Sequence, residues 1–280
     1  FGNLVPGASI ALTLNGAGTL TGGGTATTDS TGAATFSALS VNLVGSKTLT
    51  ATNGAVTATS ASFSVSPAAV ASLTFSTQPS AVVAGVAIAP SVVVKASDAF
   101  GNAVPGTSVT LSMTGAGTLT GGGTLVTDAN GLASYAGLSV NLIGSKTLTA
   151  TSGVLTATSS AFTVSHAATA SLTFTTQPSA VVAGVAMAPA VTVVAHDAFG
   201  NIVPGVSIAL TMTGTGTLTG GAAVVTDTTG VASFAALSVN LVGSKTLTAT
   251  SGLLTASSAA FTVSPAAAAS LAFKIGRAHV

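Results

Sequence analysis

Apolar and polar residues alternate in short runs along the chain, and clusters of Gly, Pro, Asn and Asp separate these runs. A period of two residues is typical of a half-buried strand, whereas an amphipathic helix repeats about every 3.6 residues, and no helical period is sustained here. Between residues 72 and 170 the alternation predicts seven short strands, over 73–76, 92–97, 108–113, 125–127, 133–135, 146–151 and 161–165. The pattern therefore predicts an all-β fold.

The same pattern returns every 99 residues. The motif FGN-x-VPG begins at Phe1, Phe100 and Phe199, GSKTLTAT surrounds Lys47, Lys146 and Lys245, and a phenylalanine follows in register at Phe63, Phe162 and Phe261. A repeat of this length is too long for one coil of a solenoid, but it matches one immunoglobulin-sized sandwich of two sheets. We therefore predict tandem immunoglobulin-like Greek-key β-sandwiches in a linear array.

Comparison of the copies predicts which side chains point into the core. In the predicted strand 92–97, the first, third and fifth residues are apolar both here and 99 residues later, while the other three change in polarity. The first set is therefore expected to face inward. The same reasoning places Phe162 and Val164 inside, opposite Leu148 and Ala150.

The SLTF and SLAF motifs set the expected boundaries of the repeats. Residues 72–170 and 171–269 are complete Ig-like repeats, residues 1–71 are a repeat that lacks its first 28 positions, and residues 270–280 begin a further one. The linkers SPAAVA, SHAATA and SPAAAA are short, so neighbouring repeats of the same chain are the expected partners. Because residues 1–71 lack two strands, we expect this repeat to be the least ordered.

The last seven residues depart from the repeat. After LTF the second and third copies continue with STQPS and TTQPS, whereas after LAF the chain ends with KIGRAHV. One reading frame of a common sequencing adapter encodes this string. Residues 274–280 are therefore predicted to be the read-through tail of an assembled metagenomic fragment, and His279 is excluded from functional reasoning.

The composition excludes several classes of function. Of the 280 residues 48% are hydrophobic and 4% are charged, and cysteine is absent, which excludes disulfides and thiolate metal sites. The net charge of +1 becomes −1, four Lys against five Asp, without Lys274 and Arg277. No basic surface for nucleic acid is therefore predicted. The longest apolar stretch, 81–94, is too short and interrupted to span a bilayer, so no membrane contact is expected. With so little charge, stability is expected to respond weakly to salt and pH.

Motifs shared by the copies resemble those of a known family. They read SLTFSTQPS, then AG, P-x-V-x-V, D-x-FGN-x-VPG, G-x-GTLTGG, TD-x-x-G-x-A and SAFTVS, and the resemblance covers residues 1–273. The chain resembles the bacterial Ig-like repeats of the invasin and intimin type (group 1) found in large surface or secreted adhesin-like proteins. The resemblance implies an extracellular or cell-surface stalk that holds a distal adhesive or enzymatic domain away from the envelope. The chain departs from the pattern in its shortage of charge and in lacking a recognisable C-terminal recognition domain.

Two functions of different classes fit this organisation. The first is a non-catalytic structural stalk or spacer in which each repeat folds alone. The alternative is a carbohydrate- or protein-binding Ig-like module that acts directly in adhesion, which predicts loops that differ between copies and carry aromatic residues. Here the loops repeat nearly verbatim, and the one tyrosine, Tyr135, stands in a predicted core strand where the other copies have Phe36 and Phe234. No catalytic residue is predicted, because no repeat assembles a nucleophile, a base and an anion site.

Two aspartates recur in each complete repeat and are the candidate metal ligands. Asp98 and Asp197 lie in DAFGN, and Asp128 and Asp227 lie in TD-x-x-G. Calcium takes about six to eight oxygen ligands, usually including several carboxylates, so two aspartates per repeat are too few. An Asp three residues before a Gly is typical of a turn whose side chain caps the backbone. We therefore favour turn capping, and we predict no metal site and no cofactor.

The glycine-rich segment 115–124 and two histidines offer other candidate chemistry. The segment is superficially similar to a phosphate-binding loop, but no GK[ST] follows and no helix is predicted to begin there, so a glycine-rich hairpin is favoured. His196 precedes Asp197, yet its counterpart in the previous copy is a serine and it falls on the outward face, which indicates a surface residue. His166 stands in a linker where the other copies have proline, and we interpret it as incidental.

One lysine recurs in each repeat, at Lys47, Lys146 and Lys245, and is predicted to point to the same side as the inward leucine two residues later. The simpler interpretation is a stem that covers the sandwich edge and an ammonium that reaches water. The alternative is a Lys–Asn isopeptide crosslink with Asp as proton shuttle, as in some Ig-like stalks of Gram-positive bacteria, although this needs a buried acid. The intact mass decides between them, because crosslinking releases ammonia.

Overall fold

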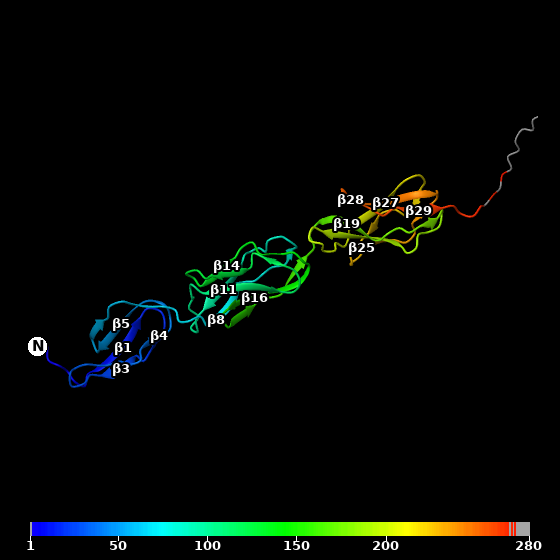
Figure 1. The fold of residues 1–280 in the computed structure, drawn as a ribbon. Coiled ribbons are helices and arrows are strands. Elements are labelled where there is room, and N and C mark those ends of the chain that lie inside the picture. Colours follow the sequence, from blue (N-terminus) through cyan, green and yellow to red (C-terminus); the bar gives the residue numbers. More distant parts are fainter. Residues whose placement is uncertain (1, 269, 271, 273–280) are drawn as a thin grey trace, which may run out of the picture.

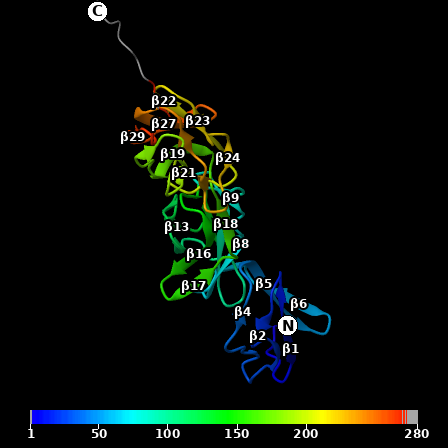
Figure 2. The same cartoon turned by 90° about the vertical axis from the view of Figure 1, so that its right-hand side faces the viewer.

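The computed structural model describes residues 2–268, 270 and 272, which form three β-rich bodies that follow one another along one long axis (Figure 1). The view at right angles shows the same succession (Figure 2). The strands of these bodies fall into three groups that pair only among themselves, and the third group begins at Thr169, two residues before the predicted boundary. The described residues contain no helix, and therefore none that is long and apolar enough to cross a membrane. The predicted tail 274–280 lies outside the described residues.

The second repeat consists of two main sheets. Its strands are β8 (Ser72–Thr77), β9 (Val82–Val83), β10 (Val92–Ser97), β11 (Ser108–Thr114), β12 (Leu119–Thr120), β13 (Gly123–Val126), β14 (Leu132–Tyr135), β15 (Ser139–Val140), β16 (Gly144–Ser152), β17 (Leu155–Thr158) and β18 (Phe162–Ser165). One sheet has the order β14-β10-β8 and the other β13-β11-β16-β18-β9, with β17 also on β16, while β12 pairs with β15. The pairs are antiparallel except for β9 with β18.

The third repeat has the same arrangement. Its strands are β19 (Thr169–Thr176), β20 (Val181–Val182), β21 (Val191–Asp197), β22 (Ser207–Thr213), β23 (Leu218–Thr219), β24 (Val224–Val225), β25 (Val231–Phe234), β26 (Ser238–Val239), β27 (Gly243–Ser251), β28 (Leu254–Ser257) and β29 (Phe261–Ser264). Its main sheets have the orders β19-β21-β25 and β20-β29-β27-β22-β24. The chain crosses from sheet to sheet in the Greek-key manner, so the predicted all-β array of Ig-like sandwiches is confirmed.

The first repeat contains one of the two main sheets. Its strands are β1 (Ser9–Asn15), β2 (Leu20–Thr21), β3 (Gly24–Thr27), β4 (Ser40–Val41), β5 (Gly45–Asn53), β6 (Val56–Thr59) and β7 (Phe63–Val65). They form a sheet of order β3-β1-β5-β6 with β7 on β5, and β2 pairs with β4. Residues 33–36, the counterpart of β14, form no strand. Among the described residues, no second main sheet lies against the inner face of this repeat.

Alternate residues of the second and third repeats meet between the sheets and form one closed hydrophobic core in each repeat. On β10, Val92, Val94 and Ala96 are fully buried, while the residues between them are half-buried. Phe162 and Leu148 lie in the same core. The inward faces predicted from the comparison of copies are therefore confirmed.

The first repeat leaves the same face partly uncovered. Phe63 is 36% exposed, whereas its counterparts Phe162 and Phe261 are 4% and 5% exposed. The difference arises because no equivalent of the β8–β10–β14 sheet, which packs on Phe162, lies over Phe63 among the described residues. That this repeat is the least ordered stays a prediction, which hydrogen exchange of its backbone amides tests.

The second repeat has more strands than the seven predicted. The largest addition is β17, which forms a hairpin with β16 through a two-residue turn where Gly153 has a φ of +57°. The short strands β9, β12 and β15 are also absent from the prediction. A signal for β17 was available, because glycine at the first turn position is typical of a two-residue type II′ hairpin.

Every strand pairing among the described residues joins strands of one repeat. The last strand of the second repeat, β18, pairs with β16 and β9, and the first strand of the third, β19, pairs with β21. The linker SHAATA thus contributes its first residue to β18 and its last two to β19, but no sheet continues across it, and neighbouring repeats meet through loops.

Candidate functional site

The residues that join two repeats belong to the DAFGN motif, which in the second repeat follows β10. The Oδ1 atom of Asp98 accepts hydrogen bonds from the backbone N–H groups of Phe100 and Asn102, both at 2.9 Å. Gly101 has a φ of +84°, a left-handed conformation that glycine adopts without a steric penalty. The motif is thus the aspartate-capped turn that the sequence favours.

The second carboxylate oxygen of Asp98 ties this turn to the linker. Its Oδ2 atom accepts hydrogen bonds from the N–H of Ala68 at 3.0 Å and from Nδ2 of Asn102 at 2.8 Å. The Asp98 side chain is 3% exposed. Its buried charge is therefore stabilised by four N–H donors, which leaves the carboxylate engaged by the protein itself.

Asn102 crosses from the second repeat to the first. Its Nδ2 atom donates to the carbonyl oxygen of Asn42 at 2.8 Å, and its Oδ1 atom accepts the N–H of Val44 at 3.2 Å. Both partners lie between β4 and β5, in residues 42–44. We call this segment, and its counterparts 141–143 and 240–242, the docking loop.

The joint between the second and third repeats has the same geometry. Asn201 Nδ2 donates to the carbonyl oxygen of Asn141 at 2.8 Å, and Oδ1 accepts the N–H of Ile143 at 3.1 Å. Asp197 again accepts a linker N–H, that of Ala167, at 2.9 Å. Because matching distances in the two joints agree within 0.1 Å, the joint is a repeated element of the fold.

A phenylalanine of the third repeat also packs on the second. Gly85, in the turn after β9, has a φ of +76°, and a Cβ atom there would lie 2.1 Å from Cζ of Phe199. The ring of Phe199 therefore fills the space of a side chain at this position. The equivalent Phe100 is more exposed, 59% against 43%, and no equivalent glycine turn packs on it among the described residues.

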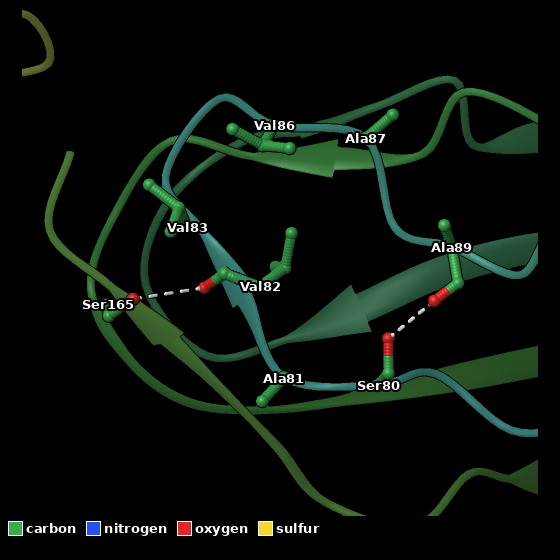
Figure 3. A pocket seen from close by; sticks show the side chains of 8 residues that line it. All are labelled: Ser80, Ala81, Val82, Val83, Val86, Ala87, Ala89 and Ser165. Carbon is green, nitrogen blue, oxygen red and sulfur yellow. Dashed lines mark hydrogen bonds between the residues drawn. The ribbon is translucent and has the colours of Figure 1, made fainter.

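A shallow hollow of about 390 Å³ lies beside the same turn (Figure 3). Its lining consists of small apolar side chains and two serines, namely Ser80, Ala81, Val82, Val83, Val86, Ala87, Ala89 and Ser165. The hydroxyl of Ser80 donates to the Ala89 carbonyl at 2.9 Å, and that of Ser165 to the Val82 carbonyl at 3.4 Å. The hydroxyls thus hold the loop in place, and the lining offers neither charge nor an activated nucleophile.

The electrostatics of the joint favour an ionised aspartate. Burial by itself raises the pKa of Asp197, but hydrogen bonds from the side chain of Asn201 and from the N–H groups of Ala167, Asn201 and Phe199 outweigh burial, so the pKa lies below its ordinary value of 3.8. The pKa of Asp98 is lowered for the same reasons.

These carboxylates predict how stability depends on pH. A folded-state pKa below the unfolded value contributes stability that is fully present above the unfolded pKa, about 3.9, and that is lost as the pH falls through the folded value. We expect the urea midpoint to stay constant from about pH 8 to about pH 5 and to fall below about pH 4. The weak pH response expected from the composition therefore applies above that range. A decline that begins near pH 6 contradicts this assignment.

The other candidate residues do not converge on a reactive site. Asp128 caps the turn after β13 by accepting two backbone N–H groups. The segment 115–124 connects the antiparallel strands β11 and β13 and contains β12, which pairs with β15, so it is a longer connection than the predicted hairpin turn. His196 is half-buried next to Asp197, whose oxygens are already bonded, and His166 lies in the linker. The described part of the chain holds no group of three or more His, Cys, Asp or Glu side chains placed to bind a metal ion.

The recurring lysine is buried, which corrects the expectation of an ammonium in water. Lys47, Lys146 and Lys245 are 5%, 3% and 3% exposed. The Nζ atom of Lys146 donates to the carbonyl oxygen of Ile143 at 3.1 Å, and the other two lysines make the equivalent bond at 3.2 Å. Lys245 also donates to Oγ1 of Thr215 at 3.3 Å. The stem passes over Gly115, where a Cβ atom would lie 3.1 Å from Cδ of Lys146. For the isopeptide alternative, the intact mass stays the test, and we expect the unmodified value.

Sequence reasoning missed the asparagines that close the joints. Their signal is the FGN triplet, in which Asn3, Asn102 and Asn201 recur although a capped turn needs only the Asp and the Gly. Their partners could not be inferred, because the docking-loop carbonyl lies 60 residues earlier and in another repeat.

No family model and no curated protein matches the chain. Solved structures similar to it include the adhesin FdeC of Escherichia coli, at 19% identity over 95% of this chain and 88% of that chain, with a TM-score of 0.45. Invasin, a bacterial integrin-binding protein, aligns at 17% identity over 93% of this chain and 54% of its own, with a TM-score of 0.44.

The adhesin InvE of Yersinia pseudotuberculosis is a further similar structure. It aligns at 19% identity over 66% of this chain and 56% of its own length, with a TM-score of 0.31. The chain thus spans about half the length of invasin and of InvE. All three TM-scores lie below 0.5.

Proposed function

We propose that the chain is a non-catalytic structural spacer of a bacterial cell-surface or secreted adhesin-like protein, in which the joints hold the repeats in line. The observation that carries the proposal is the pair of matched joints. Asn102 and Asn201 each donate to one docking-loop carbonyl and accept one docking-loop N–H. Domains linked by a flexible tether do not need such contacts, since relative motion is their default. The adhesin-like setting rests on the motif resemblance.

In this proposal residues 72–170 and 171–269 are separate folding units and residues 1–71 are an incomplete one. Two features support it. Each complete repeat has its own hydrophobic core. The strand pairings of the described residues stay within these bounds except at Thr169, which pairs with Asp197. The partners of a repeat are then its neighbours in the same chain.

Small-angle X-ray scattering of the chain and two glycine variants tests the spacer. We expect an elongated particle with a narrow range of shapes. Gly85→Ala should alter the scattering, because the added Cβ atom displaces the ring of Phe199. Gly184→Ala is the matched control: its φ of +77° imposes the same backbone strain of about 1 kcal/mol, and nothing lies within 4 Å of the added atom.

Two results contradict the spacer. One is scattering of the unmodified chain that requires a broad ensemble of bent and extended shapes. The other is specific binding of the chain to a glycan or a host protein, which favours the direct-binding module instead. An equal response of both glycine variants means that backbone strain, and not the Phe199 contact, governs the joint.

A further inference from the structure

The docking loop is held from inside its own repeat by the buried lysine. Lys146 Nζ donates to the carbonyl oxygen of Ile143 at 3.1 Å, and the N–H of the same residue donates to Oδ1 of Asn201 at 3.1 Å. The two polar groups of Ile143 therefore serve opposite sides of the joint. Its carbonyl binds the lysine within the repeat, and its N–H binds the next repeat.

The other end of the docking loop is fixed in the same way. The side-chain oxygen of Asn141 accepts the N–H of Thr118 at 2.7 Å, while its carbonyl oxygen accepts Nδ2 of Asn201 at 2.8 Å. The glycine-rich segment can approach this closely because Gly117 has no side chain. A Cβ atom there would lie only 2.9 Å from Oδ1 of Asn141. Both residues that bind Asn201 are thus also held by a hydrogen bond from within their own repeat.

The third repeat shows the loop with no DAFGN turn against it among the described residues. Lys245 Nζ donates to the carbonyl oxygen of Val242 at 3.2 Å, and the N–H of Thr217 donates to Asn240 Oδ1 at 2.7 Å. Leu241, in the middle of this loop, is 49% exposed, whereas the equivalent leucine in the second repeat is half-buried. The same internal bonds are therefore present whether or not a turn is docked.

The lysine is an expensive residue for this position if it only fills space. A buried ammonium loses its hydration and needs hydrogen-bond partners, whereas methionine would fill the same volume without that cost. The chain nevertheless places a lysine here in all three repeats, each time bonded to the docking loop. Filling of the core alone does not account for this choice.

We infer that this lysine is a positioning residue for the joint. Lys146 fixes residues 141–143 in the conformation that receives Asn201 of the next repeat, and Lys47 does the same for Asn102. A loop ordered before docking loses less conformational entropy when the next repeat binds. The inference rests on the proposed spacer function, because it concerns how the spacer keeps its repeats in line.

The test uses Lys146→Met and Lys245→Met in the 280-residue chain. Both remove a buried ammonium that donates to its own docking loop, and Lys245 donates in addition to Oγ1 of Thr215 at 3.3 Å. Of the two, only Lys146 lies behind a loop that binds an asparagine of a following repeat among the described residues. Because the chain has no cysteine, Val154→Cys and Leu253→Cys, at exposed hairpin tips, accept one spin label each in the second and third repeats. Pulsed electron paramagnetic resonance then measures the distance between the two repeats.

We expect one narrow distance in the parent, loss of that narrow distance in Lys146→Met, and its retention in Lys245→Met. A distribution in Lys146→Met as narrow as in the parent overturns the inference and leaves the spacer standing. A broad distance distribution in the parent contradicts both the inference and the spacer function. Equal broadening in the two variants overturns it as well, since general destabilisation then explains the effect. Should Lys146→Met not fold, Lys146→Gln keeps a shorter polar stem and carries the same expectations.

Discussion

The substitution Phe162→Ala is expected to destabilise the second repeat by about 3–5 kcal/mol, the usual cost of truncating a core phenylalanine. Phe162 is 4% exposed and lies in a closed core between the two sheets. Since a domain of this size is stable by about 5–15 kcal/mol, the loss removes a large part of the stability of the repeat. The chain has one tyrosine, Tyr135, and no tryptophan, so tyrosine fluorescence in a urea titration reports this repeat.

Phe63→Ala is the matched control for this prediction. Phe63 has the same position in the first repeat but is 36% exposed, because the covering sheet is missing there. We expect it to cost clearly less, and we expect the tyrosine midpoint of the second repeat to stay unchanged. Hydrogen exchange followed by mass spectrometry measures both repeats in one sample. Equal losses from the two substitutions would mean that the first repeat closes a core that the structure does not show.

The substitution Asp197→Ala is expected to destabilise the third repeat and to release its joint with the second. It removes one acceptor group that binds the N–H groups of Phe199, Asn201 and Ala167 and the side chain of Asn201. A buried donor left without an acceptor costs about 1–3 kcal/mol, so we expect a total loss on the order of 3 kcal/mol or more. Hydrogen exchange should show faster exchange of the Asn201 and Ala167 amides.

Asp227→Ala separates the joint from the turn. Asp227 caps a turn in the same repeat by accepting the N–H groups of Thr229 and Val231, but these bonds are exposed and lie away from the joint. We expect a smaller loss of stability and unchanged exchange at Ala167. If Asp227→Ala speeds exchange at Ala167 as much as Asp197→Ala does, the stability of the joint follows that of the whole repeat and does not depend specifically on the Asp197 hydrogen bonds.

The inner faces of the strands could be predicted because the copies differ in a regular way. Val92, Val94 and Ala96 keep an apolar counterpart 99 residues later, and burial follows from that alternation directly. The hairpin strand β17 was harder to predict, because LTAT occurs on both sides of its turn and only Gly153 marks the reversal. Hydrophobic periodicity locates strands that enter a core better than it locates short strands at an edge.

The joint could be predicted only in part. The cap formed by Asp98 depends on residues four positions apart at most, so the local sequence specifies it. The bond from Asn102 to the first repeat depends on how two folded bodies meet, and no local pattern encodes that. The same limit applies to the lysines. Alternation places Lys146 on the inward side, but its bond to the Ile143 carbonyl depends on the conformation of the docking loop, which the sequence pattern does not specify.

Every complete repeat carries both halves of a joint, the DAFGN turn near its start and the docking loop in its second half. A recombination event that inserts or deletes 99 codons in register therefore leaves each turn opposite a matching loop. A recombination event between two positions that are out of register would instead place a turn opposite a surface that does not match it. Genes for such chains are consequently expected to differ in length by whole repeats, with the fit between neighbours preserved in every length variant.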